Sequence, residues 1–264
     1  QSKLQKLVSP FILRRTKKQV LKDLPDKVEK DMWLNFSPEE KQLYLANLAQ
    51  VNEQLQQQLE LEQVDSILII AMMTRLRQIC CEPRMLYENY KGESTKFTMC
   101  LELIETLKEN GKKVLLFSSF TSIFDSFIEE FKQRGIKYHM ITGAVDKKKR
   151  KEEVDAFQSD DSDVFLISLK AGGTGLNLTK AQAVIHYDPW WNVSAQNQAT
   201  DRAYRIGQTK NVLVYQLLMK NTIEAKIYEM QKRKKEMSDI FVENSNGGIS
   251  TLSKEELRDL FSME

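Results

Sequence analysis

The chain has 264 residues, of which 41% are hydrophobic and 29% charged, and its formal net charge is +2. This length and apolar content predict a globular protein with one sizeable core and argue against a disordered chain. The longest apolar run, residues 67–73, is far shorter than the roughly 18 residues that span a bilayer, which argues against membrane insertion. Because the net charge is small, an anionic partner must be bound by local clusters of basic residues.

The cysteines and histidines show no metal-binding pattern. Cys80, Cys81 and Cys100 lack the paired spacing of a zinc site or of a disulfide framework, which fits a reducing, intracellular compartment. His139 and His186 each lie in an apolar, strand-like stretch, so we predict packed or hydrogen-bonded rings and no metal ligands. The chain starts without an initiator Met or a signal sequence, and we expect it to be a piece of a longer protein.

The first 92 residues predict a basic linker followed by a pair of helices. The linker carries a basic cluster and a strand-like stretch at residues 31–36. Ser37, Pro38 and Glu40 together form a capping box that starts a helix. Apolar residues then recur near helical spacing until Pro83, which predicts a helical hairpin over residues 37–90. The basic cluster of the linker consists of Arg14, Arg15, Lys17 and Lys18.

From Lys96 onward, short apolar strands alternate with helical stretches. This pattern predicts an open α/β domain with a parallel sheet. A helix that begins near Ile123 is expected to stop at Gly135. After Thr222 we expect two terminal helices, the second led by Ser253. The predicted strands are residues 114–117, 138–141, 164–167, 184–187 and 212–215.

A glycine-rich segment, residues 168–178, follows the strand at 164–167, at the position where open α/β sheets bind ligands. The dinucleotide-binding fingerprint fails because Leu178 stands where the third glycine is required, and the sequence holds no Walker A loop. We therefore expect that the chain does not hold a nucleoside triphosphate by itself. The alternative is that these glycines serve only a tight turn.

Four residues of the segment 198–208 are spaced three and four apart, so on a helix Gln198, Asp201, Arg202 and Arg205 would share one face. Two adjacent guanidinium groups suit the charge that develops on a transferred γ-phosphoryl group. The alternative is an ordinary surface salt bridge between Asp201 and Arg205, worth about 0.3–0.5 kcal/mol. Spacing alone favours the salt bridge.

A run of five basic residues, 147–151, follows the predicted N-cap Asp146. Positive charge there opposes the helix macrodipole at a cost of ~0.3–1 kcal/mol per charge. We interpret the run, together with the basic linker, as facing nucleic-acid phosphates; the alternative is a solvated helix face.

Trp190 and Trp191 are adjacent aromatic residues after the strand at 184–187. Core packing is the simpler interpretation for them, and stacking of one ring on DNA is the alternative.

Taken together, these segments resemble the second motor lobe of the Swi/Snf-type branch of helicase superfamily two, over nearly the whole chain. The ending Arg-Ile-Gly-Gln at 205–208 is typical of this branch. Val193 and Tyr204 depart from the common residues, Pro and His, but neither is one of the arginines. Residues 113–120 look like helicase motif IV, 168–178 like motif V and 198–208 like motif VI, and residues 9–17, 24–27, 81–84 and 94–96 match as well.

The resemblance implies a RecA-like parallel sheet flanked by helices, with a helical hairpin insertion and C-terminal helices. It divides the chain into a basic interlobe linker and strand (1–36), a helical protrusion (37–92), motor lobe 2 (93–220) and C-terminal brace helices (221–264). The compact hairpin favours a bacterial relative, in the cytoplasm with the nucleoid; a eukaryotic one would be nuclear.

The resemblance also assigns roles to residues. Arg202 and Arg205 would be arginine fingers for ATP, which the absent first lobe mainly holds together with Mg²⁺. The residues expected to support them or to lie at the ATP cleft are Gly173, Thr174, Gly175, Gln198 and Asp201. The expected DNA contacts are Ser119, Thr142, Gly143, Lys147, Lys148, Lys149, Lys170 and Trp191.

The implied function is that of an ATP-dependent translocase or remodeller on double-stranded DNA, whose partners are DNA and the N-terminal RecA-like lobe. The full-length protein would be a DNA-dependent ATPase, and this piece alone would be inactive. One alternative is an ATPase-inactive module that binds DNA or a protein partner. Another is an RNA helicase lobe, against which Gln208 argues because a basic residue would stand there. The oligomeric state stays open.

Overall fold

The computed structural model of the chain describes residues 25–61, 64–172, 175–190, 192–240 and 253–262. The basic cluster of the linker and three predicted site residues, Gly173, Thr174 and Trp191, lie outside these ranges.

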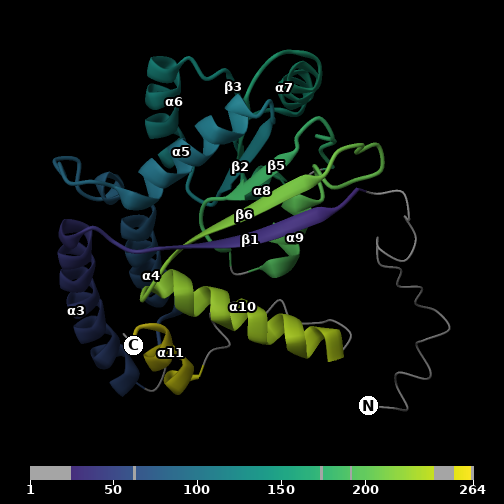
Figure 1. Ribbon diagram of the computed structural model, residues 1–264. Coiled ribbons are helices and arrows are strands. Elements are labelled where there is room, and N and C mark those ends of the chain that lie inside the picture. Colours follow the sequence, from purple (N-terminus) through teal and green to yellow (C-terminus); the bar gives the residue numbers. More distant parts are fainter. Residues whose placement is uncertain (1–24, 62–63, 173–174, 191, 241–252, 263–264) are drawn as a thin grey trace, which may run out of the picture.

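Within the described residues, six strands form one all-parallel sheet in the order β1-β6-β5-β2-β4-β3 (Figure 1). This arrangement confirms the predicted α/β class. The strand predicted at residues 31–36 begins earlier and pairs with β6 along its whole length, so it is an edge strand of the sheet. The strands are β1 (Lys27–Leu34), β2 (Val114–Ser118), β3 (Tyr138–Ile141), β4 (Val164–Ser168), β5 (Ala183–His186) and β6 (Val212–Met219).

Helices cover both faces of the sheet, as the continuous apolar strands require. On one face, α5 (Thr95–Glu109) contributes Phe97 and α6 (Ile123–Arg134) contributes Phe124 and Phe127 to one apolar core with Leu116 of β2. On the other face lie α7 (Lys147–Ser159), α8 (Leu169–Gly172) and α9 (Val193–Thr200), where Phe157 packs near Phe117. Helix α6 ends at Gly135, as predicted, in the left-handed conformation that favours glycine (φ 60°).

The predicted hairpin is present as α3 (Pro38–Glu60) and α4 (Ser66–Cys81), followed by the short 3-10 helix η2 (Pro83–Met85). The two C-terminal helices are α10 (Ile223–Ile240) and α11 (Lys254–Leu260). The predicted capping box at Ser37 is formed, and Ser253, predicted to lead the last helix, also forms one. Hairpin and C-terminal helices share one apolar core beside the end of β6 (Figure 1). The division into four segments stays a prediction.

A buried ion pair that the sequence did not suggest joins α5 to α10. Lys96 Nζ donates to Glu224 Oε1 at 2.6 Å, and both side chains are fully buried. The backbone N–H of Met219 also donates to this carboxylate, at 3.1 Å. Burial is the largest single effect and would lower the pKa of Lys96, but the charge and hydrogen bond of Glu224, together with the thiols of Cys80 and Cys81, outweigh it, so this pKa lies above its ordinary value.

Candidate functional site

The arginine segment lies in turns, not on one helix face. Helix α9 is capped by the Asn192 side chain and ends at Thr200. Of the four residues predicted to share a face, Gln198 is helical, whereas Asp201, Arg202 and Arg205 follow the helix. The prediction of a common helix face is therefore wrong. The backbone N–H of Arg202 bonds to Ala199 O at 3.1 Å, which is the tighter bonding of a chain leaving an α-helix.

Gln208 holds the turn that follows the helix. Its Nε2 atom donates to the carbonyl oxygens of Thr179 at 3.0 Å, Ala181 at 2.9 Å and Ala203 at 3.2 Å. Its Oε1 atom accepts from the backbone N–H of Lys210 at 2.9 Å. A lysine or arginine could not accept that bond. Gln208 thus ties the arginine turn to the loop before β5, a role that sequence reasoning missed.

Arg202 and Arg205 are close enough to influence each other electrostatically. Arg202 is half-buried and Arg205 is exposed. Partial burial lowers the pKa of Arg202, and the positive charge of Arg205 lowers it further, against the opposing charge of Asp201. The guanidinium group of Arg202 nevertheless remains charged at neutral pH, because the pKa of arginine lies far above it. Two neighbouring cations that destabilise each other are an arrangement that an anion would stabilise.

The glycine-rich segment meets this turn. It begins after β4 with α8 and runs back across the sheet face, where the backbone N–H of Leu178 donates to Arg202 O at 3.0 Å. Gly175 has a left-handed backbone (φ 49°), as does Gly207 (φ 100°). Such values cost other residues about 1–2 kcal/mol. The left-handed backbone therefore accounts for a glycine at position 175. The structure also places the glycine-rich segment in contact with the arginine turn.

The predicted DNA contacts gather elsewhere, at the carboxyl edge of three adjacent strands. Ser119 follows β2, Thr142 and Gly143 follow β3, and Lys170 follows β4 within α8. Because these strands are parallel neighbours, their ends share one edge of the sheet. Thr142 is half-buried, whereas Gly143 and Lys170 are exposed.

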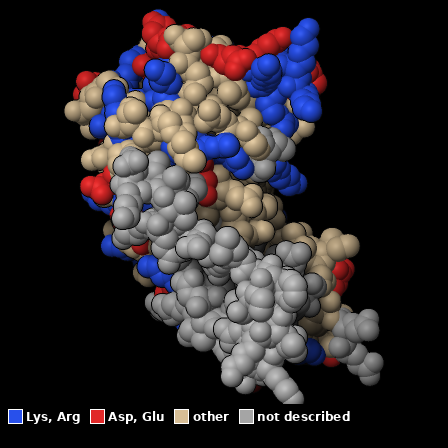
Figure 2. All heavy atoms as spheres, turned by 90° about the vertical axis from the view of Figure 1, so that its right-hand side faces the viewer, with Lys and Arg blue, Asp and Glu red and all other residues tan. Residues whose placement is uncertain are grey.

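The basic run starts α7 close to the same edge, shortly after β3. Asp146 caps the helix as predicted, accepting from the backbone N–H groups of Lys148 at 2.8 Å and Lys149 at 2.9 Å. The side chains of Lys147, Lys148 and Lys149 are exposed. Lys and Arg side chains gather at the top of the face in Figure 2, the level at which α7 lies in Figure 1, with Asp and Glu beside them.

Ser119 belongs to a buried polar cluster. Its hydroxyl donates to Asp188 and accepts from Arg77 Nη2, the latter at 2.9 Å. Arg77 also bonds Asp188 at 2.7 Å. Sequence reasoning missed Arg77 and Asp188; the available signal was a charged residue inside each of two apolar stretches.

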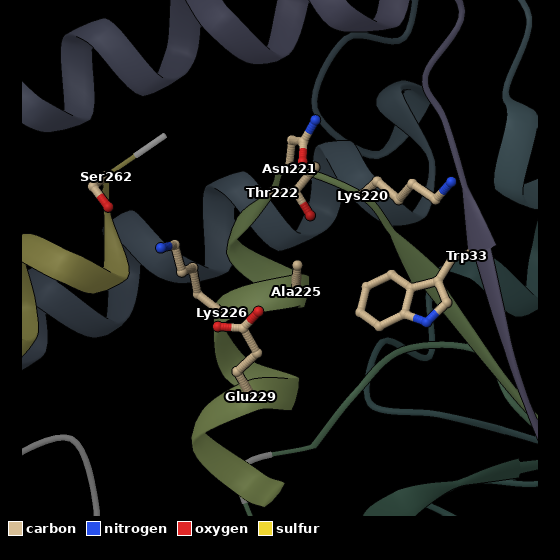
Figure 3. A pocket seen from close by; sticks show the side chains of 8 residues that line it. All are labelled: Trp33, Lys220, Asn221, Thr222, Ala225, Lys226, Glu229 and Ser262. Carbon is tan, nitrogen blue, oxygen red and sulfur yellow. The ribbon is translucent and has the colours of Figure 1, made fainter. Parts of the chain in front are cut away.

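Two cavities lie outside these sites. A cavity of about 200 Å³ at the ends of β1 and β6 includes Trp33, Lys220 and Asn221 in its lining (Figure 3). A second, of about 140 Å³, lies between α9, α10 and the strands β1 and β6. The described residues that line the two cavities include none of the predicted site residues.

The described ranges contain neither a membrane-spanning helix nor a metal-binding cluster. No helix in them is long and apolar enough to cross a membrane. No group of three or more His, Cys, Asp or Glu side chains there could hold a metal ion.

Comparisons with known proteins match both parts of the chain. Residues 95–207 match the helicase conserved C-terminal domain, and residues 1–85 match the SNF2-related domain. An uncharacterised ATP-dependent helicase of Mycoplasma pneumoniae is 40% identical over 98% of this chain. The chain spans only 25% of that relative's length.

Two solved structures are also similar to this chain. The SWI2/SNF2 ATPase core of Sulfolobus solfataricus in complex with dsDNA is 32% identical with a TM-score of 0.75, covering 100% of this chain and 56% of that one. The C-terminal domain of the Sulfolobus solfataricus SWI2/SNF2 ATPase is 26% identical with a TM-score of 0.73, covering 90% of this chain and 100% of that one. This chain therefore belongs to the Snf2-type branch of superfamily-two helicases and has the RecA-like fold of its C-terminal, second lobe.

Proposed function

We propose that this chain is the second motor lobe of an ATP-dependent translocase or remodeller on double-stranded DNA. The observation that carries the proposal is the turn that holds Arg202 and Arg205 near each other, where Leu178 of the glycine-rich segment donates a hydrogen bond to the carbonyl oxygen of Arg202. Burial and the nearby charge of Arg205 lower the pKa of Arg202. The dsDNA complex of a similar ATPase core supports the choice of nucleic acid.

In this proposal, ATP and Mg²⁺ are held mainly by the first lobe, outside this chain. Arg202 and Arg205 would face the γ-phosphate when the two lobes approach each other. Their guanidinium groups would stabilise the charge that develops on the phosphoryl oxygens, a fixed electrostatic contribution that requires no rearrangement at the moment of reaction. Gln198 and Asp201 would support the turn. This lobe alone would be inactive.

The carboxyl edge would hold the DNA backbone. Lys147, Lys148 and Lys149 would neutralise phosphates and release counterions, which adds affinity without reading sequence. Thr142, Gly143 and Lys170 would make closer backbone contacts, and Trp191 would stack on the DNA. The hydroxyl of Ser119 already donates to Asp188, so a hydrogen bond from this hydroxyl to a phosphate oxygen, which can only accept, would require its proton to turn away from Asp188.

The glycine-rich segment would couple the two sites, because it begins at the DNA edge and ends against the arginine turn. Closure of the lobes on ATP would then change the hold on DNA, and hydrolysis would release it. If the two lobes hold the same strand alternately, each cycle advances the motor along the duplex without separating its strands.

The test is the ATP turnover of the full-length protein with no nucleic acid, with duplex DNA and with duplex RNA of the same sequence. We expect duplex DNA to raise turnover at least several-fold and duplex RNA to have little effect. Equal or stronger stimulation by RNA would favour an RNA-directed helicase lobe. DNA binding without any turnover would favour an ATPase-inactive module, and either outcome contradicts the proposal.

A further inference from the structure

Arg77 is a buried cation that connects the hairpin to the sheet. It lies on α4 with 5% of its surface exposed. Its Nη2 atom donates to Asp188 Oδ2 at 2.7 Å, to Ser119 Oγ at 2.9 Å and to the carbonyl oxygen of Pro189 at 3.1 Å. One side chain of the hairpin thus contacts the segments that follow β2 and β5.

Aromatic rings from the same two segments surround the guanidinium group. Its central carbon lies 4.9 Å from the centre of the Phe120 ring and 5.8 Å from that of Trp190. Contacts with ring faces stabilise a cation that has left water. They also fix the plane of the guanidinium, which a lysine ammonium does not have.

Asp188 receives the remaining hydrogen bonds of the cluster. Its Oδ1 atom accepts from Ser118 Oγ at 2.8 Å and from the backbone N–H of Ser119 at 2.9 Å, and the residue is fully buried. A buried ion pair of this kind is not needed for stability, because apolar residues of similar volume often serve as well or better. Its fixed geometry therefore points to a role in placing the segments that it joins.

Those segments are the ones that lead into two predicted DNA contacts. Ser119 is itself one, and residues 188–190 run directly into Trp191 in the sequence. Residues 188–190 also contact α10, because Gln231 of that helix donates to the carbonyl oxygen of Trp190. Hairpin and C-terminal helix both reach this short segment.

We propose that Arg77 is a positioning residue that couples the helical hairpin to the DNA-binding edge of the lobe. This inference rests on the proposed function. Arg77 does not touch DNA; it holds Ser119 and residues 188–190 in the arrangement that DNA binds.

The test compares Arg77→Lys with wild type in the full-length protein. Fluorescence anisotropy gives the dissociation constant for a labelled duplex DNA, and ATP turnover is measured at saturating DNA. We expect the dissociation constant to rise about tenfold, equivalent to ~1.4 kcal/mol, with turnover at saturating DNA nearly unchanged. The matched control is Arg75→Lys on the same helix, because Arg75 bonds Asn47 and Tyr87 within the hairpin region.

A second variant separates positioning from stability. Arg77→Met alone leaves Asp188 charged, buried and unpaired, so it is combined with Asp188→Asn, which removes both charges. We expect the double variant to unfold near the wild-type urea concentration yet to bind duplex DNA as weakly as Arg77→Lys does. Wild-type affinity in either variant overturns the inference, as does a wild type that binds no duplex DNA. DNA binding without ATP turnover contradicts only the proposed function, because the dissociation constants of the variants for duplex DNA still test the role of Arg77.

Discussion

Gln208 is buried and fully hydrogen-bonded to the backbone of its own lobe, whereas Arg205, in the same turn, is exposed. The contrast separates two roles within one sequence motif. A polar side chain whose donors and acceptors are all used internally holds the turn, and an exposed cation remains able to bind an anion. Within residues 198–208, Gln208 therefore stabilises the turn, and Arg205 is exposed to a ligand.

His186 is a second residue whose surroundings define its chemistry. Its Nε2 atom lies 2.8 Å from Thr200 Oγ1, at the end of α9, and only 1% of its surface is exposed. Burial lowers the pKa of His186 to about 4. The ring is therefore neutral at physiological pH, and its protonation is coupled to unfolding.

We predict that acidification destabilises the chain through His186. The unfolded chain takes up this proton near pH ~6.5 and the folded chain only near pH 4, so stability present above ~6.5 is lost as the pH falls, by about 3 kcal/mol at pH 4. Urea unfolding between pH ~7 and pH ~4.5 measures this loss. In His186→Gln, which keeps a hydrogen-bonding group, the loss should be about 2 kcal/mol smaller. Equal pH dependence in both proteins would refute the assignment.

Among the elements, α5 and α10 depend on each other through the buried pair of Lys96 and Glu224. The two residues are 128 positions apart, and their contact links the sheet-covering α5 to the core that the hairpin shares with the C-terminal helices. Because α10 also contacts Trp190 through Gln231, this pair helps to fix the same segment that Arg77 reaches.

We predict that Lys96→Met destabilises the chain by about 3–5 kcal/mol, because it leaves Glu224 buried without a partner. Adding Glu224→Gln should recover most of that loss. The matched control is Lys137→Met, which removes an exposed pair with Asp161 and should cost less than about 1 kcal/mol. Urea unfolding measures all four proteins, and equal losses for the two lysine variants would contradict the expectation.

For the molecule as a whole, the local sequence pattern was sufficient to predict the α/β architecture. The strands from β2 to β6 begin at or next to their predicted positions, because each is a short apolar run, and β2, β4 and β5 are buried along their whole length. Capping boxes marked the starts of α3 and α11 for the same local reason. The family resemblance was confirmed by both domain matches.

Long-range contacts account for what the sequence did not predict. Spacing suggested one helix face for the arginines, but Gln208 bonds to a loop 27 to 29 positions earlier and so fixes a turn. Arg77 and Asp188 are 111 positions apart, so neither spacing nor composition links them. The assigned roles of the ATP and DNA contacts stay predictions, since they depend on a second lobe and on DNA.

The central claim is that the arginine turn completes an ATP site held on another lobe, and Arg205→Ala in the full-length protein tests it most directly. DNA-stimulated turnover should fall by a factor on the order of 10³, while the dissociation constants for ATP and for duplex DNA change little. Arg258→Ala, which removes an exposed arginine on α11, should leave turnover at its wild-type value. Near-normal turnover in Arg205→Ala would contradict the account.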